Sequence, residues 1–309
     1  MSIVLGPHHY SIYYDKLLNN IIYLFGEFHA KTVTQDIVEN KNIPFVDFIL
    51  NNIKSNDDKE IDIYLEKGIE KESSLLNENY TLSEQSNQGI YSINYIYKQL
   101  MFLHSSHVHV HRADLRTTGG NNNFNDIISA LYMSLAAYDK PFYISLLEQL
   151  YGSMISIRKE GDYDDSIDFL VFQSDDTNVI HISIDTLSDD IWYTIKHRLN
   201  QRLHDIGLTK KYFLAQLLLV ITKIEGGDKD ALNECQSLAV SLIKWQSVIL
   251  DLYIITHIMN STDGNVIVYC GQFHIETIEM AFDALHLHNM KKQTNSYSNI
   301  VIDKINFGY

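Results

Sequence analysis

The stretch "IIYLFGEFH", residues 21–29, is an apolar run that stops at the motif Gly-x-Phe-His. A second run, "VIVYCGQFH" at residues 266–274, stops in the same way. Short apolar runs that end at turn residues are typical of buried strands. Because the carboxyl ends of parallel strands meet at one edge of a sheet, we expect His29 and His274 to share a site there. The alternative is two unrelated histidines that pack separately.

Three more strand-like runs occur at residues 61–65, 107–112 and 300–305. Segments of helical length separate the early runs, at residues 32–49 and 91–104, and Pro44 would interrupt or restart the first of these helices. Strands that alternate with helices indicate βαβ units and a mostly parallel sheet.

From residue 125 to about 261 the patterns are mainly helical. The exceptions are "SIDFLVFQ" (166–173) and "NVIHISI" (178–184), which are interpreted as the two strands of a hairpin. We therefore predict a single α/β domain over residues 1–309. It would consist of a mostly parallel sheet with flanking helices and a long, mainly helical insertion at residues 117–263.

The composition excludes some classes of protein. A net charge of −15 argues against nucleic-acid binding, which needs a basic surface to neutralise phosphates. The first residues lack the pattern of a signal peptide, and the run at 212–224 is too short to span a bilayer. Two cysteines provide no disulfide framework, so we expect a reducing, cytoplasmic location. Many Tyr and few Pro residues are typical of AT-rich genomes, such as those of some bacteria and large DNA viruses.

Polar residues follow the predicted strands, where a sheet of this class binds its ligands. They are Glu27, His29, Glu66, His111, Arg112, Asp114, Arg116 and His274. About 0.6 Gly-x-x-His matches are expected by chance from 14 Gly and 14 His in 309 residues, so the bare pattern is weak. The apolar run before each copy and the helix pattern after it strengthen the pair. A third copy, Gly6-Pro-His-His9, is interpreted as incidental.

The residue types at this edge suggest how a site would work. Each motif glycine, Gly26 and Gly271, would allow a sharp turn or a close backbone approach. The helix start that follows would attract an anion. Glu66 closes an apolar strand, where a carboxylate needs a partner. Glu66 is therefore either a residue of the active site or one member of a structural ion pair with Arg112 or Arg116.

The alternating His107, His109 and His111 point to one face of a strand. Same-face positions are ~7 Å apart, too far for one zinc ion unless the strand bends. The open interpretations are a zinc site, a half-buried polar face, or a His111 that joins the main site.

These motifs resemble the erythromycin esterase/ChaN/TraB-Tiki superfamily. The matching positions are Gly26–His29, Glu66 in "IYLEK", the segment "ADLR" at residues 113–116, and Gly271–His274. The Gly-Glu-x-His form is similar to the esterase and ChaN branches, and the paired Gly-x-x-His form to the Tiki/TraB branch. The resemblance covers residues 20–116 and 264–309. It implies an α/β fold with a helical insertion and a cleft at the strand ends, and activities that include ester hydrolysis, metal-dependent peptide hydrolysis and haem binding.

We accordingly expect a hydrolase that cleaves an ester or peptide-type bond in a small molecule or peptide. In a metal-free form, His29 would take a proton from water, oriented by Glu27 or Glu66, and Arg112 or Arg116 would stabilise the oxyanion. His274 completes this catalytic set. The residues expected to bind substrate are His111, Asp114, Gly26 and Gly271.

A metal-bound form is the second possibility for this site. His29, His274 and Glu66 would hold one divalent ion, such as Zn, Mn or Co, with an open position for water. The rival hypothesis is a catalytically degenerate binding protein on the same fold. Gln272, which stands where an acid would assist, favours this rival.

Overall fold

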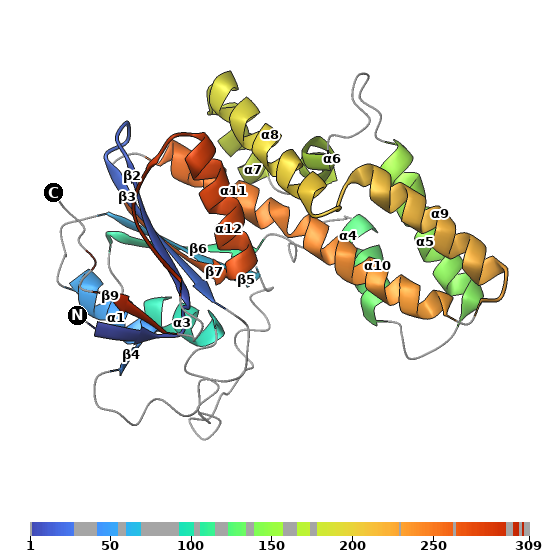
Figure 1. Ribbon diagram of the computed structural model, residues 1–309, viewed down its shortest axis with the longest axis horizontal. Coiled ribbons are helices and arrows are strands. Elements are labelled where there is room, and N and C mark those ends of the chain that lie inside the picture. Colours follow the sequence, from blue (N-terminus) through green and yellow to red (C-terminus); the bar gives the residue numbers. More distant parts are fainter. Residues whose placement is uncertain are drawn as a thin grey trace. The chain divides into compact units, whose positions relative to one another are not determined.

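The computed structural model describes residues 2–27, 42–54, 60–68, 93–101, 106–114, 123–133, 139–156, 166–173, 178–228, 230–261, 264–294, 299–302 and 305. The chain forms two compact units. One comprises Met1–Thr117 and Tyr253–Tyr309, and the other comprises Thr118–Leu252. Figure 1 shows strands in the first unit and helices in the second.

A six-stranded mixed sheet is the centre of the first unit, in the order β6-β5-β7-β3-β2-β8. Its strands, in chain order, are β2 (His9–Asp15), β3 (Asn20–Glu27), β5 (Ile61–Gly68), β6 (Val108–Asp114), β7 (Asn265–Gly271) and β8 (His288–Thr294). The pairs β6–β5, β5–β7 and β7–β3 are parallel, whereas β2 and β8 are antiparallel to their neighbours. The predicted α/β fold with a mostly parallel sheet is therefore confirmed.

The two Gly-x-Phe-His strands lie side by side. In the parallel pair β3–β7, Gly26 is opposite Cys270 and Glu27 is opposite Gly271. Both strands are almost completely buried, which explains why each has a continuous apolar run. The predicted adjacency of these strands is confirmed, and it places both motifs at one edge of the sheet.

Helices cover both faces of this sheet, and side-chain alternation assigns residues to one face or the other. Helices α1 (Phe45–Lys54) and α3 (Ile93–Met101) pack on the face that carries Tyr23, Phe25 and Tyr269. Helix α12 (Gln272–Ala284) lies on the opposite face, where Phe282 contacts Tyr13 edge-on. Residues of α11 (Val248–Asn260) from Tyr253 onward pack there too, against Tyr64. Figure 1 shows these helices around the sheet.

A small second sheet lies in the same unit, in the order β4-β1-β9. Its strands are β1 (Ser2–Leu5), β4 (Asn42–Pro44) and β9 (Asn299–Ile302). The C-terminal strand predicted at residues 300–305 is thus present, but it pairs with β1 and not with the main sheet. The helix predicted at residues 32–49 is wrong at Asn42–Pro44, which form β4; α1 begins directly after Pro44, and residues 32–41 lie outside the described part of the chain.

The second unit is helical. Its helices are α4 (Asn123–Met133), α5 (Lys140–Ser156), α6 (Ser166–Gln173), α7 (Asn178–Asp185), α8 (Asp189–Asp205), α9 (Lys210–Glu225) and α10 (Ala231–Gln246). Trp245 is fully buried in its core and stacks on Phe169 at 5.3 Å between ring centroids. Phe213 and Phe124 pack against the same indole.

The hairpin predicted at residues 166–184 is wrong, because both segments are helices, α6 and α7. Short, continuously apolar runs carry no period that separates a buried strand from a buried helix. Five of the first six side chains of α6 are buried, Asp168 being the exception, so the segment is apolar on nearly all sides. Neighbouring helices bury it, and the propensity of Ile, Val and Phe for strands is overridden.

Within the part of the chain that the structure describes, one helical stretch, Ala231–Asn260, has the length and mean hydropathy of a membrane span. However, 78% of its most apolar window is buried inside the fold, as in the core helix of a soluble protein.

Candidate active site at the carboxyl edge of the sheet

Glu66 and His274 meet at the carboxyl edge of the sheet. The Nε2 atom of His274 lies 3.3 Å from Oε1 of Glu66. The side chains are only 7% and 12% exposed, respectively. A carboxylate and an imidazole in contact, largely withdrawn from water, form a pair that can hold and transfer a proton. The structure thus brings together two of the residues that the sequence placed in one site.

The start of α12 holds the Glu66 carboxylate in place. Gly271 is the N-cap residue of this helix, and its backbone N–H donates to Oε2 of Glu66 at 2.7 Å. His274 is the third residue of the helix, so it projects from the first turn. The unsatisfied N–H groups of a helix start carry partial positive charge and stabilise a carboxylate. The motif Gly271–His274 therefore supplies both the imidazole and the backbone N–H that orients the Glu66 carboxylate.

Gly26 lets the start of α12 approach β3 closely. A Cβ atom at this position would lie 2.3 Å from Oε1 of Gln272 and 3.2 Å from Cβ of His9. The amide of Gln272 is the far end of a flexible side chain and can move aside, whereas Cβ of His9 would have to shift by a few tenths of an ångström. A side chain at this position is therefore disfavoured, and Gln272 packs against the strand end.

Glu27 lies at the same edge but on the opposite face of the sheet from Glu66. The hydroxyl of Tyr269, a residue of the central strand, donates a hydrogen bond to Glu27. Burial first, and then the Glu27 carboxylate, raise the pKa of Tyr269 well above its usual value. Tyr269 thus stays a hydrogen-bond donor at neutral pH and fixes the direction of the Glu27 side chain.

Arg112 belongs to that opposite face as well. Its Nε and Nη2 donate to the hydroxyl of Tyr97 on α3 at 2.8 and 2.6 Å, and its guanidinium lies 4.6 Å from the centre of the Tyr97 ring. In the sheet Arg112 is opposite Leu65, one residue before Glu66, and alternate side chains point to opposite faces. Asp114, half-buried, is opposite Gly68 at the end of β6.

Histidines in and just before β6 contact carboxylates in and just before β5. Nδ1 of His107 and Nε2 of His109 contact the two oxygens of Glu60 at 3.1 and 3.0 Å. Nε2 of His111 lies 2.7 Å from Asp62. His111 also stacks on Tyr64, two residues before Glu66. The residues form a partly exposed polar face along β5 and β6.

His29 and Arg116 lie outside the described residues. Within the described ranges, no group of three or more His, Cys, Asp or Glu side chains is arranged to hold a metal ion. Glu66 and His274 offer one oxygen and one nitrogen donor. A three-ligand site would need His29, so the metal-bound form stays a prediction.

The third Gly-x-x-His copy reaches the same edge, which sequence reasoning missed. The backbone N–H of His8 donates to the carbonyl of Gly26 at 2.9 Å, and His9 is opposite Gly26 in the antiparallel pair β2–β3. A signal was the alternating pattern of "HYSIYYD", which begins at the last residue of the motif, His9, and is typical of a strand with one buried face.

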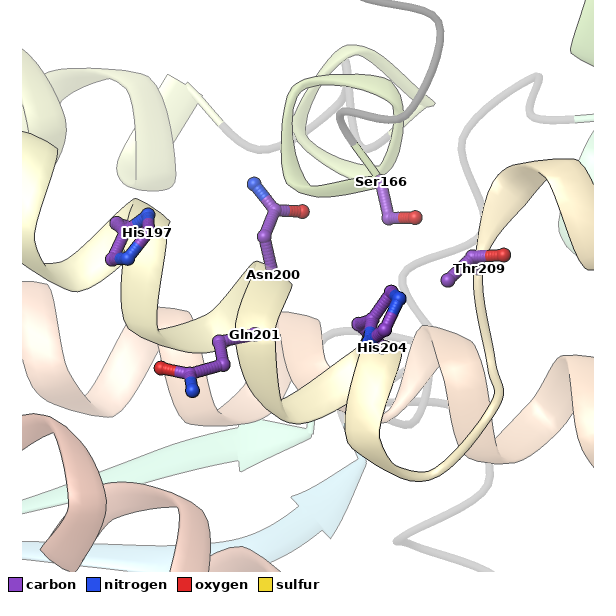
Figure 2. A pocket seen from close by; sticks show the side chains of 6 residues that line it. All are labelled: Ser166, His197, Asn200, Gln201, His204 and Thr209. Atoms are coloured by element: carbon purple, nitrogen blue, oxygen red, sulfur yellow. The ribbon is translucent and has the colours of Figure 1, made fainter.

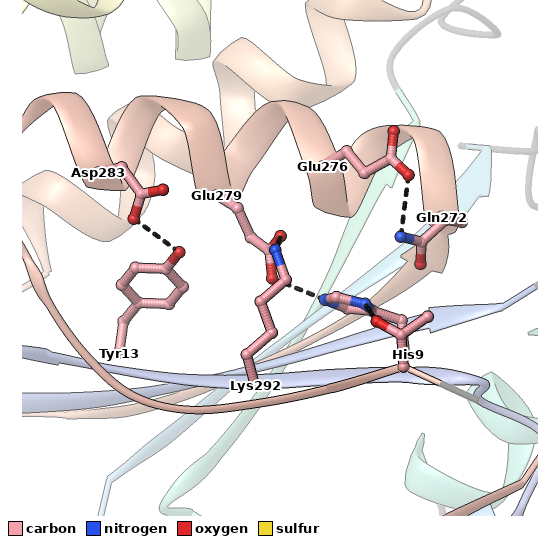
Figure 3. A network of polar contacts seen from close by, with 8 residues as sticks. His9, Tyr13, Gln272, Glu276, Glu279, Asp283 and Lys292 are labelled. Carbon is pink, nitrogen blue, oxygen red and sulfur yellow. Dashed lines mark hydrogen bonds and ion pairs between the residues drawn. The ribbon is translucent and has the colours of Figure 1, made fainter.

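His9 belongs to a buried polar network between β2, β8 and α12, shown in Figure 3. Its Nε2 contacts Glu279 at 2.7 Å and its Nδ1 contacts Thr294 at 2.8 Å. Lys292 donates to the second oxygen of Glu279 at 2.6 Å. Although burial would raise it, the hydrogen bonds from His9 and Lys292 lower the pKa of Glu279 to about 2.

A cavity of about 400 Å³ lies in the helical unit (Figure 2). Its lining consists of Ser166, His197, Asn200, Gln201, His204 and Thr209. Ser166 accepts the N–H of Lys210, Asn200 accepts the N–H of Ile167, and Thr209 caps α9. Several of these polar side chains therefore accept backbone N–H groups at the first residues of helices.

No protein-family model, curated protein or solved structure matches this chain. The superfamily resemblance accordingly stays a prediction that rests on the short motifs.

Proposed function

We propose that this protein is a hydrolase that cleaves an ester or amide-type bond with the Glu66–His274 pair as its proton-transfer group. The observation that carries the proposal is the contact of these two side chains, 3.3 Å apart and largely buried, at the start of α12. The carboxyl edge of a parallel sheet is where α/β proteins bind ligands. Carboxylate–imidazole pairs in such places are recurrent elements of acid–base catalysis.

The chemistry assigns a separate task to each group. Glu66 accepts the Gly271 N–H with one oxygen and faces Nε2 of His274 with the other, so it fixes the ring and stabilises an imidazolium. The proton passes to or from the substrate at Nδ1, the opposite ring nitrogen. The first turn of α12 provides N–H groups that the helix itself does not use, and these would stabilise the oxyanion. This task had been expected of Arg112 or Arg116.

The substrate is proposed to be a small molecule or a peptide in the cytoplasm. In the metal-assisted form, Glu66 and His274, with His29, would hold a divalent ion that polarises the scissile carbonyl and supplies hydroxide at neutral pH. The superfamily resemblance supports either form.

The test is hydrolysis of a panel of alkyl esters and peptides by the full chain, with and without a chelator. Glu66→Gln and His274→Gln should each lower kcat/KM by about 100-fold or more, the usual contribution of a general acid or base. His288→Gln, an exposed residue of β8, is the matched control and should keep the wild-type rate. Ligand binding without turnover in the wild type would favour the degenerate binding protein.

A further inference from the structure

Helix α9 is apolar on two opposite faces, one buried and one exposed. The buried face packs in the helical unit, where α9 contacts α5 and α10 (Figure 1), and its residues are Phe213, Leu217, Val220 and Ile224. The opposite face is exposed, and its centre consists of Tyr212, Ala215, Leu218, Leu219 and Thr222. These positions fall on one side of a helix with about 3.6 residues per turn.

The exposed face has the composition of a contact between helices. A helix at the surface of its own unit usually carries polar residues on its outer side. Here Tyr212, Leu218 and Leu219 are 40%, 47% and 44% exposed. In addition, Tyr212, Ala215, Leu219 and Thr222 are alternately three and four residues apart, which is the spacing of a coiled-coil seam. The face therefore suits a second helix from outside the unit.

The charges at the two ends of this face fit a second copy of α9 that lies antiparallel to the first. Lys211 and Glu225 flank the apolar residues, and both are exposed. Leu218 lies midway between them in the sequence, so the three residues hold equivalent places beside the seam in successive heptads. When Leu218 of one copy meets Leu218 of the other, each Lys211 lies beside Glu225 of the partner subunit. The face is thus complementary to itself, as a two-fold interface requires.

These two charges oppose the dipole of their own helix. Lys211 lies in the first turn of α9, which contains no acidic residue, and Glu225 is the last residue of the helix. A cation at a helix start and an anion at a helix end are both unfavourable in an isolated helix. An antiparallel partner gives each of them an opposite charge, whereas a partner of one charge sign would repel one end of the face.

We propose that this protein forms a two-fold homodimer through the exposed face of α9. The axis passes by Leu218, and an ion pair between Lys211 and Glu225 closes each end. In this register, Leu219 faces Ala215 of the partner subunit, so a large side chain meets a small one, and Tyr212 faces Thr222 of the partner subunit. The inference is independent of the proposed hydrolase activity.

The first test is sedimentation velocity of the full chain over a series of concentrations. The wild type should show a concentration-dependent dimer. Leu218→Glu should weaken it about 100-fold or more, because two carboxylates would meet at the axis. Since Leu218 is exposed, the fluorescence of the buried Trp245 should be unchanged in this variant. Leu17→Glu, at a residue of the α/β unit that is 90% exposed, is the matched control and should keep the wild-type dissociation constant.

The second test exchanges the charges. Lys211→Glu and Glu225→Lys each place like charges together at both ends, so each variant alone should dimerise about tenfold or more weakly than the wild type. An equal mixture of the two variants should recover the dimer, because opposite charges then meet at both ends of the mixed pair. Both changes improve the interaction with the helix dipole, so the thermal stability of each variant should not fall.

Three results would overturn the proposal. The first is a wild type that stays monomeric up to its solubility limit. A monomer that binds phosphatidylcholine vesicles, and loses this binding in Leu218→Glu, would assign the face to a lipid surface instead. The second is a dimer that Leu218→Glu does not weaken, which would place the interface elsewhere. The third is a mixture of Lys211→Glu and Glu225→Lys that associates no better than either variant alone.

Discussion

Glu279→Gln should destabilise the α/β unit by about 3 kcal/mol at pH 7. Glu279 is 3% exposed and accepts hydrogen bonds from His9 and Lys292. Its pKa falls from 4.5 to about 2 on folding, and each pKa unit corresponds to about 1.4 kcal/mol. A depressed folded pKa means that this stability is complete above pH 4.5. It is lost as the pH falls from 4.5 towards 2, so wild type and variant should converge there.

Both tryptophans, Trp192 and Trp245, lie in the helical unit, so their fluorescence does not report on Glu279. The suitable assay is hydrogen exchange of the central strand β7, corrected for the intrinsic exchange rate at each pH. Asp283→Asn on the exposed side of the same helix is the control. Its amide oxygen can still accept the Tyr13 hydroxyl, so the substitution should cost less than about 1 kcal/mol. A loss below about 1 kcal/mol for Glu279→Gln, or a loss that is the same at pH 7 and pH 3, would refute the reasoning.

Three further changes test the packing. Gly26→Ala should destabilise the α/β unit by about 1–3 kcal/mol, because the new methyl group would meet Gln272, and the added change Gln272→Ala should restore part of the loss in hydrogen exchange of β7. Trp245→Ala should destabilise the helical unit by about 3–5 kcal/mol, followed in urea by the fluorescence of Trp192. Asp62→Asn should lower the stability of the α/β unit at neutral pH, because the ion pair with His111 holds the pKa of Asp62 below 3.8 even though burial would raise it. In thermal unfolding, the difference between variant and wild type should disappear as the pH falls through that lowered pKa.

The strand ends were the part of the fold that sequence patterns determined best. A parallel strand that is buried on both faces needs a continuous run of apolar residues. Two such runs that end at glycine therefore allowed β3 and β7 to be located, and their pairing to be predicted, from the sequence. The same logic brought Glu66 and His274 together, because each follows a strand that reaches the common edge.

The rest depended on contacts that a linear pattern does not contain. Alternate residues of β6 point to opposite faces of the sheet, so the register decides whether Arg112 faces Glu66 or Tyr97. The pairing of β5 with β6 places Arg112 opposite Leu65, on the Tyr97 face. His9 could not be singled out, because its burial results from the pairing of β2 with β3 and β8, which the neighbouring sequence signals only weakly.

The most direct test of the central claim is a double-mutant cycle on Glu66 and His274 with an alkyl ester as substrate. If the two side chains act as one proton-transfer pair, the double variant should lose no more kcat/KM than the more impaired single variant. Losses that multiply in the double variant would show that the residues act independently, and unchanged rates in both single variants would contradict the account of this site.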